Sequence, residues 1–269
     1  MDPPVYDTLI LSDVHLGSEC SRARDATQVL KDNRFRRLIL LGDIFADLNF
    51  GRLTKEHWKF LGYIRKLSNP KRNVEVIWVE GNHDQGLTDI ISHLVGVRVY
   101  QEYVWQYAGM RHLAIHGHQF DRLVANNLRL NYLGTLLYLR LEKLDLKGKP
   151  VARFFDRLNT RWLRMSTKVA SGALFHARLN KADRIFCGHT HVAMQQERDG
   201  HHYYNAGGWI DSKPTYITID EEGVRIHEYQ ERPDHRDSSQ ERGETDSTVA
   251  EFAGESGLPG DAEYENIGS

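Results

Sequence analysis

Five short apolar runs recur along the chain, and each one ends in Asp, Asn or His next to glycine or within two residues of it. Runs of this length that stop at a turn signal are typical of buried β-strands. The runs lie in the stretches LILSDVHLGS, RLILLGDIFADL, VEVIWVEGNHDQG, HLAIHGHQFD and DRIFCGHTHV. The pattern therefore predicts five strands that carry polar side chains at their carboxyl ends.

The first run delivers Asp13 and His15, two residues apart, at its end. In a strand, residues i and i+2 point to the same side, so both side chains can face one point. That arrangement suits a pair of metal ligands. An aspartate that caps a turn beside an ordinary buried histidine explains this segment equally well, so the first run decides nothing by itself.

The other four runs repeat the same pairing of a strand end with ligand-type side chains. Taken singly, Asn82 is explained by a turn, His116 by the core and Asp43 by a helix N-cap. Their repetition favours convergence, because the carboxyl ends of strands in an open α/β sheet line one crevice. The candidate metal ligands are Asp13, His15, Asp43, Asn82, His116, His189 and His191.

Seven ligands are too many for one tetrahedral ion and suit two ions that are five- or six-coordinate. Imidazole and carboxylate ligands without thiolate favour Mn, Fe, Zn, Co or Ni over Mg or Ca, and we expect two divalent transition-metal ions, with Mn preferred. His83, next to Asn82, is the candidate catalytic residue, with a structural role as its alternative.

Composition limits the class of protein. The 269 residues are 40% hydrophobic, which is ordinary for a globular chain, and no apolar stretch approaches the roughly 18 residues that span a bilayer. The start MDPPVYD lacks the basic region of a signal peptide, and two cysteines without paired spacing fit a reducing compartment. These features predict a cytoplasmic protein.

Charge is distributed unevenly. Residues 231–269 hold eleven acidic residues and three Arg with few apolar ones, so we expect a disordered acidic tail. The remaining 32 basic and 26 acidic residues give a domain over 1–230 a net charge of +6. An anionic ligand is therefore expected.

The basic charge is concentrated between the fourth and fifth runs, where residues 122–181 hold thirteen Lys or Arg and three acidic residues. Apolar and basic positions alternate there at helical spacing, which predicts a helical insertion with a cationic stripe. Candidate substrate-binding residues in this stripe are Arg157, Arg161 and Arg164. Because Leu, Phe and Trp are interleaved with the cations, a phosphorylated amphiphile or an anionic membrane surface is favoured over nucleic acid. A helical hairpin with a solvated basic face is the plain alternative.

After the fifth run, residues 198–230 alternate between apolar and polar types, with turn signals at Asp199-Gly200 and Glu222-Gly223. Alternation of this kind predicts antiparallel strands. Asn205 and Gly207, within the stretch NAGGW, are weaker site candidates because an ordinary turn also explains them.

In order, the motifs are D-x-H, G-D-x-x-x-D, G-N-H-D, a lone His after a strand and G-H-x-H, across Tyr6 to Tyr229. This set resembles the calcineurin-like metallophosphoesterases. The resemblance implies a four-layer α/β/β/α sandwich with the helical insertion as a lid and residues 198–230 at its far edge. It places one ion on Asp13, His15 and His191 and the other on Asn82, His116 and His189, with Asp43 bridging. It also implies that His83 contacts the phosphoryl group.

Two departures from the family pattern are visible. The second motif has Ala46 where relatives usually have an Asp that orients the histidine of the third motif, so Asp47, Asp84 or neither takes that part here. HGHQFD, the helical insertion and YYNAGGW are similar to the group around UDP-2,3-diacylglucosamine hydrolase, which cleaves a pyrophosphate in lipid A assembly. That group usually has Arg at the position of His83, which leaves the substrate open.

We therefore expect hydrolysis of a phosphodiester or pyrophosphate in a lipid-linked or nucleotide-sugar substrate. The alternatives are a nuclease or nucleotide phosphodiesterase on the same scaffold, and a non-catalytic scaffold. The last would be expected to lack ligands, and no ligand is missing.

Overall fold

The computed structural model describes residues 5–120, 165–211 and 213–231. Most of the basic insertion, including Arg157, Arg161 and Arg164, lies outside these residues, as does the acidic segment from residue 232 onward. The predictions made for those segments stay predictions.

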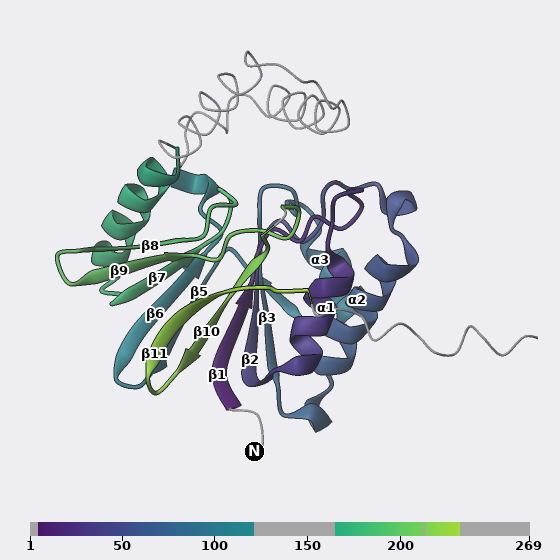
Figure 1. Cartoon of the computed structure of the whole chain (residues 1–269), viewed down its shortest axis with the longest axis horizontal. Helices are drawn as coiled ribbons and strands as arrows, with labels where there is room; N and C mark the ends of the chain where they lie inside the picture. The colour runs from purple at the N-terminus through teal and green to yellow at the C-terminus, as the bar shows by residue number, and fades with distance from the viewer. Residues whose placement is uncertain (1–4, 121–164, 212, 232–269) are drawn as a thin grey trace, which may run out of the picture. The chain divides into compact units, whose positions relative to one another are not determined.

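The described strands form two sheets (Figure 1). The six-stranded sheet has the order β11-β10-β1-β2-β3-β4. Its strands are β1 (Val5–Leu11), β2 (Arg34–Leu41), β3 (Glu75–Val79), β4 (Arg98–Tyr100), β10 (Thr215–Asp220) and β11 (Gly223–Glu228). Strands β1 to β4 run parallel, and β10 pairs antiparallel with both β1 and β11.

The second sheet is five-stranded within the described residues, with the order β5-β6-β7-β9-β8. Its strands are β5 (Glu102–Tyr107), β6 (Met110–Ile115), β7 (Arg184–Cys187), β8 (Met194–Arg198) and β9 (His201–Asn205). Strands β6, β7 and β9 run parallel, while β5 and β8 pair antiparallel at the two edges.

Helices cover the outer face of each sheet (Figure 1). The first sheet carries α1 (Ala23–Asp32), α2 (Lys55–Leu67) and α3 (Thr88–Val95). Residues 165–179 form a helix beside the second sheet. Short 3₁₀ turns occur at η1 (Phe50–Arg52), η2 (Pro70–Arg72) and η3 (His118–Phe120). The chain therefore has the predicted α/β/β/α order of layers.

Three apolar clusters hold these layers together. One lies between α1–α3 and the first sheet and includes Leu9, Leu38 and Trp78. A second, with Ile10 and Phe186, fills the space between the sheets, and a third packs Leu113 against the 165–179 helix. Central strands such as β1 and β2 are buried on both faces, which explains why their sequences are continuous apolar runs.

All five apolar runs are strands, as predicted, but they divide between the sheets: β1, β2 and β3 in one and β6 and β7 in the other. The predicted antiparallel strands are also present. Hairpin β8–β9 turns at Asp199-Gly200. It extends the second sheet, whereas β10–β11 extends the first. The expectation that this stretch forms a single far edge is therefore corrected, because the connection after Asn205 crosses from one sheet to the other.

Candidate dinuclear metal centre

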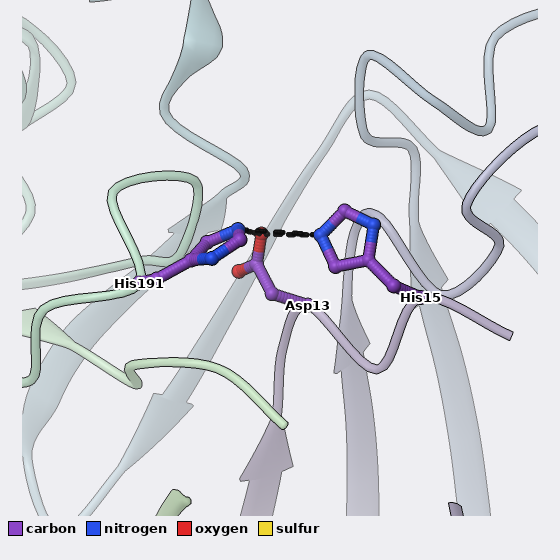
Figure 2. A group of neighbouring side chains, drawn as sticks. All are labelled: Asp13, His15 and His191. Atoms are coloured by element: carbon purple, nitrogen blue, oxygen red, sulfur yellow. Dashed lines mark hydrogen bonds and ion pairs between the residues drawn. The ribbon is translucent and has the colours of Figure 1, made fainter. Parts of the chain in front are cut away.

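The first group of ligand-type side chains comes from the loops after β1 and β7. Figure 2 shows the rings of His15 and His191 on either side of the Asp13 carboxylate. Asp13 Oδ1 lies 3.1 Å from His191 Nε2 and 3.7 Å from His15 Nε2. The two imidazole nitrogens are 3.2 Å apart. These three side chains thus present their ligand atoms to one point, within 4.8 Å of one another.

The second group consists of Asp43, His116 and His189, whose ligand atoms also lie within 4.8 Å of one another. His116 Nε2 is 3.3 Å from Asp43 Oδ2, and His116 Nδ1 is 2.9 Å from the carbonyl oxygen of Leu41. Because a carbonyl only accepts, Nδ1 carries the proton, which leaves Nε2 as the atom that can bind a cation.

Backbone hydrogen bonds join the two groups. The amide of His189 donates to Asp13 Oδ2 at 2.9 Å, and the amide of His15 donates to the carbonyl of Asp43 at 3.0 Å. A residue of each group therefore helps to hold a residue of the other. The six side chains form one cluster at the junction of the two sheets, buried except for the partly exposed His191.

Left-handed backbone conformations recur among these residues. Such φ values are uncommon outside glycine and concentrate at functional sites, because the surrounding structure must hold them in place. They occur at Asp13 (φ 54°), His15 (51°), Asp43 (50°), His189 (68°) and His191 (55°). This corrects one expectation: Asp13 and His15 lie beyond the end of β1, so their convergence comes from the turn and not from strand alternation.

Close backbone approach explains the glycines beside the ligand types. A Cβ on Gly81 would collide with the amide nitrogen and Oδ1 of Asp43, and a Cβ on Gly188 would collide with Ser12 Oγ and Asp13 Oδ2. The loops after β3 and β7 can therefore reach these carboxylates only because both positions lack a side chain.

Neighbouring charges shift the pKa values of side chains in both groups. Burial by itself raises the pKa of Asp13, but the charge of His191 and the polar contacts with His15 and His191 outweigh burial and hold that pKa well below its usual value. Burial lowers the pKa of His116, yet the Asp43 carboxylate raises it to about 10. When no metal is bound, these neighbours therefore favour the anionic form of Asp13 and the cationic form of His116.

The donor set fits divalent cations. Asp13, Asp43 and His116 are almost fully buried, with exposures of 0%, 2% and 0%. Among the described residues, buried Asn82 Oδ1 has no hydrogen bond, and the close polar neighbours of Asp13 Oδ1 and His116 Nε2 are other ligand-type atoms, His191 Nε2 and Asp43 Oδ2. Buried polar atoms normally have partners, so carboxylate, amide and imidazole atoms arranged in this way are the expected ligands of a metal.

His83 lies at the edge of this cluster. Its amide donates to Asp43 Oδ1 at 2.8 Å, and its side chain, 36% exposed, has Nε2 4.0 Å from Asp43 Oδ2. The ring stands 5.2 Å from that of His15, centroid to centroid. His83 is therefore beside the ligand groups and partly open to solvent, as a residue that contacts substrate must be.

Neither Asp47 nor Asp84 is the direct hydrogen-bond partner of His83 Nδ1. Asp47 pairs with Arg52, and the carboxylate of Asp84 accepts backbone amides. The partner of His83 Nδ1 is instead the carbonyl oxygen of Ala46, at 2.6 Å. A backbone group thus stands where relatives usually have the second aspartate of the motif.

Several positioning residues were not recognised in the sequence. Ser12 Oγ lies 2.6 Å from Asp13 Oδ2, and buried His57 accepts the Gly17 amide at 3.2 Å through Nδ1. His118 lies beside His116 and His189, with ring centroids 5.5 and 6.3 Å away. The HGH triplet was a signal for His118, whereas Ser12 and His57 leave no pattern of their own.

Asn205 supports the site indirectly. Its Nδ2 donates to the carbonyl of Gly188 at 2.6 Å, and its Oδ1 accepts the amide of Gly207 at 2.9 Å. Asn205 therefore fastens the loop that carries His189 and His191.

The sequence profile of the calcineurin-like phosphoesterase superfamily domain matches residues 7–223. No curated protein matches the chain. Solved structures that resemble it include a single mutant of Vps29 from Entamoeba histolytica, with 13% identity, a TM-score of 0.42, and 82% of this chain and 97% of that one covered.

Two further structures are a novel archaeal phosphodiesterase (16% identity, TM-score 0.45, 82% and 99% covered) and a predicted phosphoesterase from Streptococcus pneumoniae (13%, 0.38, 83% and 98%). At these identities and TM-scores the assignment rests on the domain profile, which spans most of the chain and contains both groups of ligand-type side chains. The chain belongs to the calcineurin-like phosphoesterase superfamily, whose members are metal-dependent phosphoester hydrolases.

Proposed function

We propose that the protein is a dinuclear metallophosphoesterase that hydrolyses a phosphodiester or pyrophosphate bond. One cation would be held by Asp13, His15 and His191, and the other by Asn82, His116 and His189, with the Asp43 carboxylate between them. The observation that carries this proposal is the pair of three-residue groups, each with ligand atoms within 4.8 Å. We favour Mn, with Fe, Zn, Co or Ni as the alternatives.

The protein side chains have separate tasks in this reaction. When bound, two divalent cations polarise a phosphoryl oxygen and lower the pKa of a water molecule. His83, whose Nδ1 is held by Ala46, presents Nε2 at the edge of the cluster. We assign it contact with the phosphoryl group, as a general acid or as a donor to the developing charge.

For the substrate, we propose a lipid-linked or nucleotide-sugar pyrophosphate such as UDP-2,3-diacylglucosamine. The support is the composition of residues 122–181, which combine a net charge of +10 with many Leu residues, three Phe and one Trp. Arg157, Arg161 and Arg164 would bind its phosphates. The same composition supports peripheral association with an anionic membrane, and two cysteines without paired spacing support a cytoplasmic location. No helix in the described ranges is both long and apolar enough to cross a bilayer.

A substrate panel tests the reaction class. It consists of UDP-diacylglucosamine, a bis-aryl phosphodiester, a cyclic dinucleotide and single-stranded DNA, each assayed with Mn and with a chelator. We expect Mn-dependent hydrolysis of the aryl diester and the fastest turnover with the acylated pyrophosphate. Preferential cleavage of DNA would favour the nuclease alternative. Absence of metal-dependent hydrolysis from the whole panel would contradict the proposal.

A charge-reversal experiment tests the insertion. Replacing Arg157, Arg161 and Arg164 with Glu should reduce activity on the acylated substrate at least tenfold, about 1.4 kcal/mol, while the aryl diester is hydrolysed as before. The matched control reverses three exposed cations elsewhere, Lys55, Lys66 and Lys71, which changes net charge equally. Equal losses on both substrates, or equal losses in both variants, would contradict a recognition role for the insertion.

A further inference from the structure

The loop after β2 replaces a missing carboxylate with a backbone carbonyl. Ala46 has no side chain that could bind a histidine, yet its carbonyl oxygen lies 2.6 Å from His83 Nδ1. Because a carbonyl can only accept, this contact holds the proton on Nδ1 and turns Nε2 away from Ala46. The orientation of His83 therefore depends on where the Ala46 carbonyl is placed.

Asp84, the next residue after His83, fixes that loop. Its two carboxylate oxygens accept the amides of Ile44 at 3.1 Å and Phe45 at 2.9 Å. The side chain is fully buried, with 0% exposure. Leu16 adds two backbone hydrogen bonds. Its carbonyl accepts the amide of Ala46 at 2.9 Å, and its amide donates to the carbonyl of Ile44 at 2.7 Å. The backbone amide of every residue from 44 to 46 therefore donates a hydrogen bond that fixes the loop.

We propose that Asp84 is a positioning residue for phosphoryl contact, and that it acts through the Ala46 carbonyl on the His83 ring. His83 and Asp84 are consecutive residues that bind the same loop. His83 donates to its Ala46 carbonyl, and Asp84 accepts its amides. Because the His83 ring is 36% exposed, packing alone does not restrain it, and the carbonyl supplies the missing restraint. This inference deepens the proposed function and rests on it.

A double-mutant cycle measures the connection. In Asp84→Asn, an NH₂ group must face one of two amide donors, so the loop loses a hydrogen bond and Ala46 shifts. We expect kcat for the bis-aryl diester to fall at least tenfold, with KM and bound metal within about twofold of wild type, because small misplacements of catalytic groups are costly. In a His83→Ala background, the same substitution should lower kcat less than about threefold.

The matched control is Asn205→Ala, which loosens the His189 and His191 loop on the other sheet. The fold-losses in kcat from Asn205→Ala and His83→Ala should multiply in the double mutant, because Asn205 does not act through His83. If the losses from Asp84→Asn and His83→Ala also multiply, or if Asp84→Asn loses metal, Asp84 merely supports the metal site and the inference is overturned.

A milder variant and a spectroscopic readout do not depend on Asp84→Asn folding well. Ala46→Gly leaves Asp84 and all candidate ligands unchanged but makes the backbone that carries the residue 46 carbonyl more flexible. We expect a smaller loss of kcat than in Asp84→Asn, and no further loss in the His83→Ala background. In ¹⁵N spectra of the metal-free protein, the His83 ring signal is identified by its absence from His83→Ala. In the wild type this signal should show a proton on Nδ1. In Asp84→Asn and in Ala46→Gly it should show a mixture of the two tautomers. A single unchanged tautomer in both variants would overturn the inference, even if the wild type hydrolyses no substrate in the panel.

Discussion

Gly188 offers the sharpest test of how the ligand loops pack. The residue follows β7 directly, and a Cβ there would collide with Ser12 Oγ and Asp13 Oδ2 and lie 2.8 Å from Ser12 Cβ. Neither neighbour can move aside, because both are fully buried and Asp13 Oδ2 is held by the amide of His189 at 2.9 Å. We therefore predict that Gly188→Ala displaces the Asp13 carboxylate.

The size of the effect follows from two costs. Overpacking a filled interior costs about 1–3 kcal/mol, and losing one hydrogen bond to a charged group costs about 1.5–3 kcal/mol. A combined loss of about 2.5–6 kcal/mol in a domain of this size lowers Tm by on the order of 10 °C. The displaced Asp13 should also weaken the first metal group, so the variant should retain at most one ion.

Thermal unfolding with a chelator measures the packing cost without metal, and elemental analysis after Mn loading measures the ligand loss. Gly62→Ala is the matched control, because Gly62 is an exposed residue of α2 with no atom within 4 Å of an added Cβ. That substitution should raise stability by about 0.5–1 kcal/mol, since alanine loses less backbone entropy in a helix. If Gly188→Ala melts within about 2 °C of wild type and keeps two ions, the packing argument is refuted.

Three other predictions concern the metal groups. Asp43→Ala should abolish turnover and reduce the bound metal from two ions, as measured by elemental analysis; full activity with one ion would contradict a bridging role. His83→Ala should lower kcat by about two orders of magnitude while metal content stays unchanged, and loss of metal with activity would make it a ligand or a structural residue. Metal loading should release protons at pH 7, because the Asp43 carboxylate raises the pKa of His116 to about 10 and a ligand must be neutral. Mn affinity should therefore fall with decreasing pH, and calorimetric titrations in buffers of different ionisation enthalpy will detect the proton; an identical binding enthalpy in every buffer would show that none is released.

Local sequence patterns were sufficient for the five apolar strands and for the ligand types that follow them, whereas β4 and β5 were not predicted. An apolar run such as Leu9–Leu11 needs burial on both faces whatever surrounds it, so the run itself indicates a central strand. The Asp, Asn or His that follows each run marks a carboxyl end, and in parallel strands such ends share one edge. Candidate ligands such as Asp43 and His116 were therefore recognised without knowledge of the tertiary fold.

The tertiary structure decided how these ends meet and what holds them. The five strands divide between two sheets, and the amide that holds Asp13 belongs to His189, 176 residues away. Whether an Asp or His takes a left-handed turn depends on the loops packed around it, which short-range patterns do not encode. The partner of His83 is the clearest case. Every residue carries a backbone carbonyl, so no side chain in the sequence reveals that Ala46 supplies the one that binds His83.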